Sequence, residues 1–180
     1  MPKPLPEAAE PATTQGRRRD PVRAWIGLGA NLGARQVTLE RAIDALRQVP
    51  LSRLVARSRL WRSAPVQAHG PEFLNAVTLL ETRLDSIALL EHLQAIEARF
   101  GRERPYPNAP RTLDLDLLMF GNEHRDTPML QLPHPRMHLR AFVLAPLLEL
   151  APDLEIPSHG RARDLLDALQ HQTCSALRPS

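Results

Sequence analysis

The chain has one cysteine, one lysine and few aromatic residues. Cys174 is the only cysteine among 180 residues, which excludes an internal disulfide framework and agrees with a reducing compartment. No apolar run approaches the roughly 18 residues of a membrane-spanning helix, and the N-terminus lacks the apolar core of a signal peptide. These absences predict a cytoplasmic protein that does not span a membrane.

The hydrophobic content of 43% is enough for one core, and the length favours a single folded domain. We expect a disordered Pro/Ala/Thr-rich extension over residues 1–22, a folded domain over 23–172 and a tail over 173–180. Because Lys3 is the only lysine, nearly all of the positive charge is arginine. The planar guanidinium group of arginine suits bidentate contacts with phosphate, so this composition permits a phosphate ligand.

The stretch APRTLDLDLLMFG reads as a strand that carries two aspartates. Side chains alternate between the faces of a strand, so Asp114 and Asp116 share one face, while Leu113, Leu115 and Leu117 point to the other. Like charges this close repel each other unless a cation offsets them. A divalent ion such as Mg²⁺ prefers carboxylate oxygens, so the pattern indicates a metal site. A half-solvated strand with an acidic outer face is the alternative.

Near the start of the domain, RAWIGLGANLGAR predicts a strand over 24–28 that runs into a turn containing Gly27, Gly29 and Gly33. An apolar stripe at helical spacing then predicts a helix over 35–48. The glycine spacing matches neither the dinucleotide-binding motif nor the P-loop, so both of those sites are excluded.

The remaining periodicity completes an alternating order of elements. Strands are expected over 53–62 and 73–82, and a helix is expected from an N-cap at Asp85 to Phe100, with Gly101 ending it. The order strand, helix, strand, strand, helix, strand predicts an α+β fold, namely a ferredoxin-like βαββαβ antiparallel sheet with helices on one face plus C-terminal helices. The face without helices would then be open to a ligand.

Basic residues gather around the aspartate strand. Arg102, Arg104 and Arg111 precede it or begin it, and His134, Arg136, His138 and Arg140 follow in LPHPRMHLR. Carboxylates that hold metal ions, surrounded by arginines that neutralise spreading charge, are typical of a triphosphate site.

At this point the sequence resembles a known family. RTLDLDLLMFG followed by LPHPRMHLRAFVLAPLLELAPDL is similar to the signature region of the 6-hydroxymethyl-7,8-dihydropterin pyrophosphokinases of folate biosynthesis, and WIGLGANLG, FLNAVTLLET and QAIEARFGRER resemble other family segments in the same order. The resemblance covers about residues 23–157. The loop RPYPNAPR departs from it, since better-known members often carry a tryptophan there.

The resemblance implies transfer of pyrophosphate from ATP to the pterin hydroxymethyl oxygen, with release of AMP. It implies that Asp114 and Asp116 bind two Mg²⁺ ions and that Arg102 and Arg111 contact the phosphates. The nucleotide-side positions that it implies are Gln94, Glu97, Arg104, Leu117, His134 and Arg140. The implied pterin-side positions are Ser63, Ala64, Val66, Phe73, Asn75 and Phe142.

Two other functions remain open from the residues. A metal-dependent nucleotidyltransferase also combines a glycine-containing turn with paired aspartates, but it commonly needs a third carboxylate that we do not find. An RNA-binding module on the same sheet would expect aromatics on the sheet face, and only 4% of the residues are aromatic. We therefore expect small-molecule partners, ATP and the pterin, with no nucleic acid, no membrane and a monomeric chain.

Overall fold

The computed structural model describes residues 19–65, 71–101 and 112–178. The helices are α1 Arg35–Leu46, α2 Ser86–Arg99, the short 3-10 helix η1 Met137–Leu139, α3 Ala141–Leu150 and α4 Ala162–Asp167. The strands are β1 Val22–Ala30, β2 Ser52–Arg57, β3 Trp61–Ser63, β4 Phe73–Thr82, β5 Asp114–Phe120, β6 Arg125–Asp126, β7 Gln131–Leu132, β8 Glu155–Ile156, β9 Gly160–Arg161 and β10 Cys174–Ala176.

One antiparallel sheet organises the molecule. Its strand order is β10-β3-β4-β1-β5, and β2 also pairs with β4. The sheet is therefore built around β1, which has β4 on one side and the aspartate strand β5 on the other. The chain thus has a mixed α and β structure with an antiparallel sheet, as the sequence predicts.

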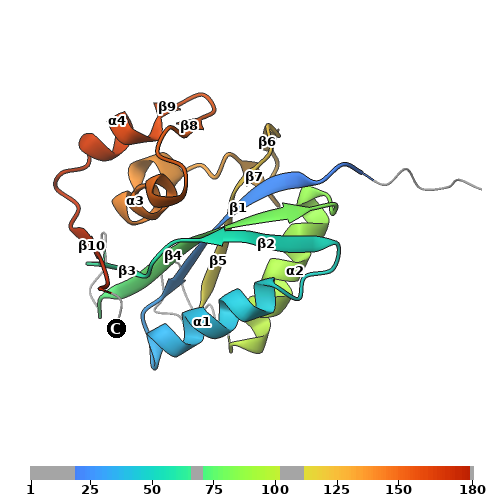
Figure 1. Ribbon diagram of the computed structural model, residues 1–180, viewed down its shortest axis with the longest axis horizontal. Helices are drawn as coiled ribbons and strands as arrows, with labels where there is room; N and C mark the ends of the chain where they lie inside the picture. Colours follow the sequence, from blue (N-terminus) through green and yellow to red (C-terminus); the bar gives the residue numbers. More distant parts are fainter. Residues whose placement is uncertain (1–18, 66–70, 102–111, 179–180) are drawn as a thin grey trace, which may run out of the picture.

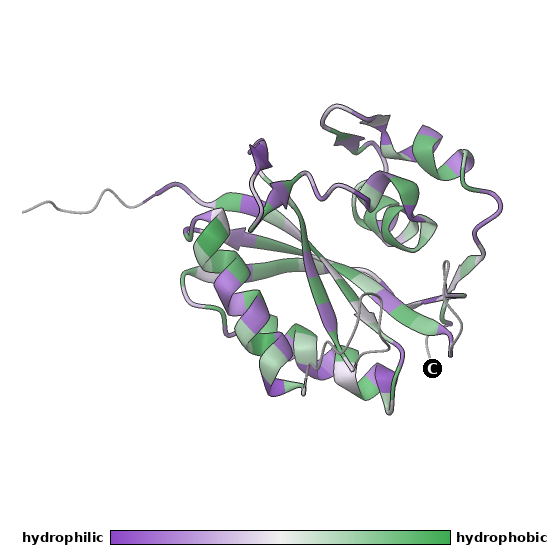
Figure 2. Cartoon of the chain, turned by 180° about the vertical axis from the view of Figure 1, so that it is seen from behind, coloured by the Kyte–Doolittle hydropathy of each residue, from purple (hydrophilic) through white to green (hydrophobic). Residues whose placement is uncertain are grey.

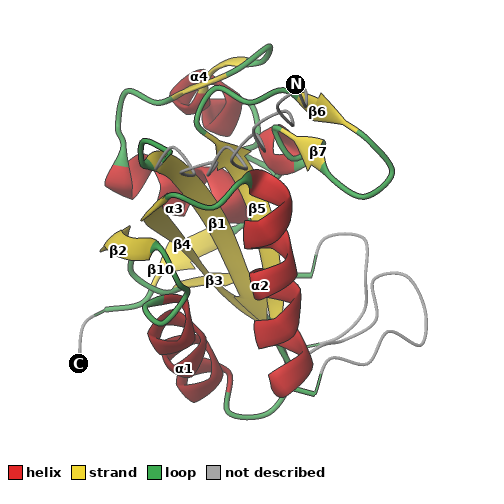
Figure 3. Ribbon diagram, turned by 90° about the vertical axis from the view of Figure 1, so that its right-hand side faces the viewer, coloured by secondary structure: helices red, strands yellow, loops and turns green. Residues whose placement is uncertain are grey.

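Each face of the sheet packs against a different set of helices. On one face Ile26 and Leu28 of β1 join a buried cluster that includes Leu39 of α1 and Leu93 of α2, and α2 runs alongside β5 (Figure 3). On the other face Trp25 of β1 packs with α3 and the C-terminal elements (Figure 1). Figure 2 colours α3 almost entirely as hydrophobic, whereas α1 and α2 alternate, because α3 is enclosed between the sheet and α4. The second face is therefore not left uncovered, since α3 covers part of it.

Several predicted features are confirmed. Asp85 caps α2, with its Oδ1 accepting a hydrogen bond from the Ala88 N–H at 2.8 Å. Gly101, with a φ of +72°, follows the end of that helix. The strand predicted over 53–62 is instead two strands, β2 and β3. The reason lies at Ser58, whose side-chain oxygen, instead of a backbone carbonyl, accepts the Val77 N–H at 2.9 Å and so interrupts the ladder.

The glycine-rich segment also differs from the prediction. Gly27 and Gly29 lie inside β1, which continues to Ala30, and only Gly33 adopts the positive φ of a turn, at +60°. After α4, β10 pairs with β3, and Gln172 binds the start of α3 by accepting the Ala141 N–H at 2.9 Å. The segment that follows the predicted domain end thus continues the sheet. Among the described residues, no helix is both long and apolar enough to cross a bilayer.

Candidate active site

The two aspartates lie side by side on one face of β5. Each is partly exposed, whereas Leu115 between them is buried in the cluster beneath α1 and α2. Asp114 pairs with Gly29 and Asp116 pairs with Gly27 on β1. The alternation expected from the sequence is therefore confirmed for this pair.

The two glycines form the floor between the aspartates and β4. Gly29 pairs with Asn75 on its other side, so Asn75, Gly29 and Asp114 form one row across three strands. Adjacent strands lie about 4.8 Å apart, which separates the backbones of Asn75 and Asp114 by about 10 Å. A side chain at Gly29 would enter this row, since its Cβ would lie 3.4 Å from the Asn75 Oδ1. No side chain of β1 therefore stands between Asn75 and Asp114 in this row.

Asn75 is a buried amide held by β3. Its side chain is 4% exposed, and its Nδ2 donates to the Ser63 Oγ at 2.9 Å and more weakly to the Trp61 carbonyl at 3.5 Å. Because both acceptors engage the nitrogen, the amide orientation is fixed and its oxygen is directed toward the Gly29 position. The buried amide that the sequence places among apolar neighbours therefore has its partners.

Beside Asp116 lie an arginine and a histidine from the segment that follows β7. The Arg140 Nη1 lies 3.6 Å from the Asp116 Oδ2, and the His134 Nε2 lies 3.9 Å from the same oxygen. The backbone fixes the histidine, because the His134 N–H donates to the Leu118 carbonyl of β5 at 2.8 Å. The structure thus brings together residues 18 to 24 positions apart in sequence around one carboxylate.

The protonation state of His134 follows from its surroundings. Burial lowers the pKa of His134 below its usual 6.5, and the charges of Arg140 and Arg136 lower it further, whereas Asp116 and Asp114 oppose this. The His134 Nδ1 accepts the Arg136 N–H at 3.2 Å, so the ring proton lies on Nε2 and faces Asp116. These surroundings favour the neutral form of His134, whose Nε2–H can donate a hydrogen bond toward Asp116.

Two half-buried aromatic residues flank the row. Phe73 lies on β4 two residues before Asn75 and on the same face. Phe142 lies in the first turn of α3, on the element that covers part of this face, and the Arg140 Cζ is 5.7 Å from the centroid of its ring. Arg140 thus links the aspartate side of the site to the aromatic side.

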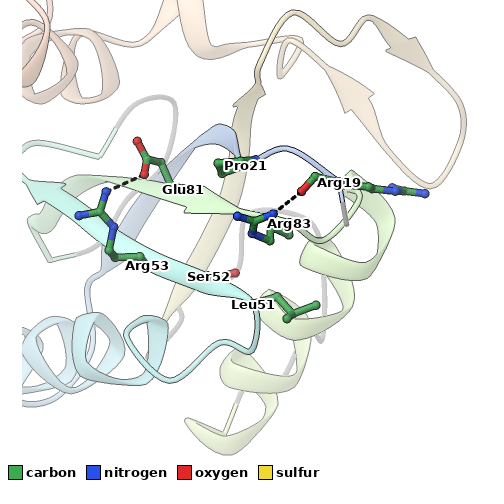
Figure 4. A pocket seen from close by; sticks show the side chains of 7 residues that line it. All are labelled: Arg19, Pro21, Leu51, Ser52, Arg53, Glu81 and Arg83. Atoms are coloured by element: carbon green, nitrogen blue, oxygen red, sulfur yellow. Dashed lines mark hydrogen bonds and ion pairs between the residues drawn. The ribbon is translucent and has the colours of Figure 1, made fainter. Parts of the chain in front are cut away.

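A hollow lies at the opposite end of the sheet (Figure 4). It is lined by Arg19, Pro21, Leu51, Ser52, Arg53, Glu81 and Arg83, around the end where Val22 pairs with Thr82. Its charged groups engage one another: Arg53 pairs with Glu81 at 2.7 Å, and the Arg83 Nη1 donates to the Arg19 carbonyl at 2.8 Å. We therefore place the candidate site at the aspartates.

The sequence was compared with known protein families and structures. Residues 25–152 match the model of the 7,8-dihydro-6-hydroxymethylpterin-pyrophosphokinase (HPPK) family. The chain belongs to this family. The match includes β1 from Trp25 onward, the paired aspartates and the segment through the end of α3.

Curated relatives carry the same name, 2-amino-4-hydroxy-6-hydroxymethyldihydropteridine pyrophosphokinase. The protein from Pseudomonas aeruginosa is 46% identical over 147 residues, which cover 81% of this chain and 91% of that protein. The protein from Haemophilus influenzae is 37% identical over 159 residues, which cover 88% of this chain and 99% of that protein. Among solved structures, the HPPK-DHPS of Plasmodium falciparum aligns with a TM-score of 0.67 at 14% identity. The alignment covers 86% of this chain but only 46% of that longer one, and it supports the fold.

The positions expected on the nucleotide side lie on different elements. Gln94 is exposed on α2, whereas Glu97 is 1% exposed and accepts the Leu115 N–H on its Oε1 at 2.8 Å. Leu117 is buried in the core on the face away from the aspartates. Of the pterin-side positions, Ser63 is buried and Ala64 is exposed. The expected positions Val66, Arg102, Arg104 and Arg111 lie outside the described residues.

The carboxylates of Asp114 and Asp116 are the candidate ligands for magnesium. Within residues 19–65, 71–101 and 112–178, no group of three or more histidine, cysteine or acidic side chains could hold a metal ion. The pair Asp114 and Asp116 presents partly exposed carboxylates on one face. Mg²⁺ in phosphate-transfer sites commonly takes one or two carboxylates and completes its shell with water and substrate phosphates. The aspartate pair of this HPPK chain fits that kind of binding.

Sequence reasoning missed two features of the site. It placed Gly27 and Gly29 in a turn, although Ala24, Ile26, Leu28 and Ala30 alternate with them at the spacing of a longer strand. It also gave no sign of the tertiary contact made by Trp61. The hydrogen bond from Trp61 to Glu149 of α3 joins segments 88 residues apart, and no local sequence pattern predicts such a contact.

Proposed function

We propose that this chain transfers the diphosphate group of ATP to the hydroxymethyl oxygen of 6-hydroxymethyl-7,8-dihydropterin and releases AMP, a step of folate biosynthesis. The family membership and the names of its relatives support this activity. The observation that carries it into the structure is the row of Asn75, Gly29 and Asp114. This row joins a fixed amide to a carboxylate across an unobstructed strand, at a separation of about 10 Å.

The pterin occupies the Asn75 end of the row in this proposal. The fixed amide reads the polar edge of the ring, and Phe73 and Phe142 contact its faces. Aromatic contacts of this kind prefer stacked or offset geometry and add to the burial of apolar area. Ser63, Ala64 and Val66 complete this side, with Ser63 acting through its hydrogen bond to Asn75.

The triphosphate lies at the aspartate end. Arg140 and His134, which lie beside Asp116, would donate to phosphate oxygens there, and the proposal gives Arg102, Arg104 and Arg111 the same role. Gln94 is exposed and is assigned to the nucleotide side, whereas Glu97 is buried and would act through its hydrogen bond to the Leu115 N–H. A contact from Leu117 would have to come from its backbone because its side chain is in the core. The ferredoxin-like topology is supported by the position of β1 between β4 and β5.

In the reaction the hydroxymethyl oxygen attacks the β-phosphorus, the bond from the β-phosphorus to the bridging oxygen of AMP breaks, and the hydroxyl proton is lost. Asp114 and Asp116 would hold two Mg²⁺ ions, which would neutralise phosphate charge and lower the pKa of the hydroxyl. The protein's own contribution is mainly orientation and fixed positive charge, since phosphoryl transfer is catalysed chiefly by positioning and electrostatics.

The test is to incubate the purified protein with ATP, Mg²⁺ and the pterin and to separate the nucleotides. AMP that forms only when the pterin is present is the expected result. Release of free pyrophosphate would instead indicate a nucleotidyltransferase, and ADP would indicate transfer of a single phosphoryl group. A folded protein that changes no nucleotide under these conditions would refute the proposed function.

A further inference from the structure

Glu149, near the end of α3, connects this helix to the strand beside the pterin-side row. Its Oε2 accepts a hydrogen bond from the Trp61 Nε1 at 2.9 Å. Its Oε1 accepts hydrogen bonds from the Arg59 N–H at 3.0 Å and from the Arg59 Nε at 3.2 Å. The Glu149 side chain is 23% exposed, and the Arg59 guanidinium lies 5.9 Å from the Trp61 ring centroid. One carboxylate thus joins α3 to β3 through its Oε2 and to the segment just before β3 through its Oε1.

On the helix side, this bridge shares a helix with an aromatic residue of the site. Phe142 and Glu149 are seven residues apart in α3, which is about two turns, so they lie on the same side of the helix. The same helix packs against β3, β4 and β10 in the fold. Any displacement of the end of α3 away from β3 would therefore also displace Phe142 relative to the sheet.

On the strand side, the bridge reaches the amide of the site. Trp61 is paired directly with Asn75, and its carbonyl lies 3.5 Å from the Asn75 Nδ2. Ser63, the stronger acceptor of that amide, is two residues further along the same short strand. Because β3 has only three residues, its placement depends strongly on contacts made outside the ladder.

We propose that Glu149 is a positioning residue that fixes the separation between Phe142 on α3 and Asn75 on β4, acting through Trp61 and Arg59. The proposal rests on the proposed function, in which the pterin ring lies between these two groups. The side-chain partners of Glu149 in the described part of the chain are Arg59 and Trp61, and not the aspartates, Arg140 or His134. Its removal should therefore weaken pterin binding selectively and leave nucleotide binding nearly unchanged.

Three variants separate the contributions. Glu149→Ala removes both acceptors, and we expect the dissociation constant of the pterin to rise about tenfold, as when charge-assisted hydrogen bonds are lost. Trp61→Phe keeps an aromatic ring but no N–H donor, and a rise of about fivefold is expected for one lost bond. Glu149→Gln retains one acceptor oxygen but presents an N–H donor in place of the other, so we expect a rise of about fivefold, like that of Trp61→Phe.

The measurement is an equilibrium titration of the pterin in the presence of Mg²⁺ and an ATP analogue with a methylene bridge between the α- and β-phosphorus. The affinity of the analogue alone is measured in parallel and is expected to change less than about twofold. Tryptophan emission gives a readout independent of ligand, because loss of the Glu149 contact exposes the Trp61 indole while the 9% exposed Trp25 stays buried. Glu81→Gln is the matched control, since it loses a carboxylate that is 26% exposed and paired with Arg53 at the far end of the sheet.

An unchanged pterin affinity in Glu149→Ala and Trp61→Phe would overturn the proposal, and so would equal losses for the pterin and the nucleotide. Urea titration identifies any variant that fails to fold. If Glu149→Ala fails to fold, the pterin affinities of Trp61→Phe and Glu149→Gln still test the proposal. A wild-type protein that neither binds the pterin nor forms AMP would overturn the proposed function itself. A wild type that does both, beside unchanged variants, would overturn the positioning role alone.

Discussion

Replacement of Asp116 by asparagine should separate catalysis from stability. The substitution keeps the shape of the side chain but removes the charge that faces Arg140 at 3.6 Å and the His134 ring at 3.9 Å. If the aspartate serves metal and phosphate binding, turnover depends on this charge. The fold depends on it far less, because Leu115 and Leu117 anchor β5 in the core.

The expected stability change follows from exposure. The side chains of Asp116 and Arg140 are 32% and 21% exposed, so their ion pair is near the surface, where such pairs contribute about 0.2 to 1 kcal/mol. For a chain of this size, a loss of that order lowers the melting temperature by no more than about 2 to 4 °C. By contrast, loss of one preorganised electrostatic group in an active site commonly costs about 100-fold to 1,000-fold in turnover.

The assay measures AMP formation at saturating ATP, pterin and Mg²⁺, alongside urea and thermal unfolding. Asp114→Asn is made in parallel, and Glu81→Gln serves as the control, since it removes one charge from an ion pair away from the site. We expect turnover to fall at least about 100-fold in both aspartate variants and to stay within about twofold in the control. An Asp116→Asn protein with more than a tenth of the wild-type turnover would refute the metal assignment, and a loss of activity explained by unfolding would refute the stability estimate.

Three further predictions concern stability. Thr78 is completely buried and its hydroxyl has no hydrogen-bond partner in the described part of the chain, so Thr78→Val should raise the free energy of unfolding by about 1 kcal/mol; a urea titration that shows a loss would indicate a hidden partner. Leu51 is 66% exposed and has a φ of +56°. Leu51→Gly should therefore relieve the strain of this left-handed backbone and stabilise the protein by about 0.5 to 1 kcal/mol. An unchanged unfolding midpoint in urea would contradict this. Burial lowers the pKa of His138 below 6.5, and so does the neighbouring His159 ring, whose centroid is 3.8 Å from that of His138. The contribution of His138 to stability is therefore complete above pH 6.5 and is lost as the pH falls through the lower folded-state pKa. Unfolding titrations at pH 5 and pH 7.5 should therefore show a smaller pH effect in His138→Gln than in the wild type, and equal effects would contradict the assignment.

Much of the fold follows from local patterns. The segment FLNAVTLLET predicts β4 at the bounds that the structure has, and Asp85 and Gly101 mark the two ends of α2. These predictions succeed because strand alternation and helix capping depend on residues only a few positions apart. The division between β2 and β3 could not be predicted, because it depends on the contact of Ser58 with Val77 of another strand.

The sequence by itself determined that Asp114 and Asp116 share one face of a strand, because alternation is a property of the extended backbone. Its long motif also determined the family, which the family comparison confirms. Only the tertiary structure decided what lies opposite these carboxylates. The register across β1 sets Asn75 and Gly29 in a row with Asp114, and the path of the chain after β7 brings Arg140 to Asp116. Register, and contacts such as that between Trp61 and Glu149, result from packing the whole sheet against its helices, and so they have no local signature in the sequence.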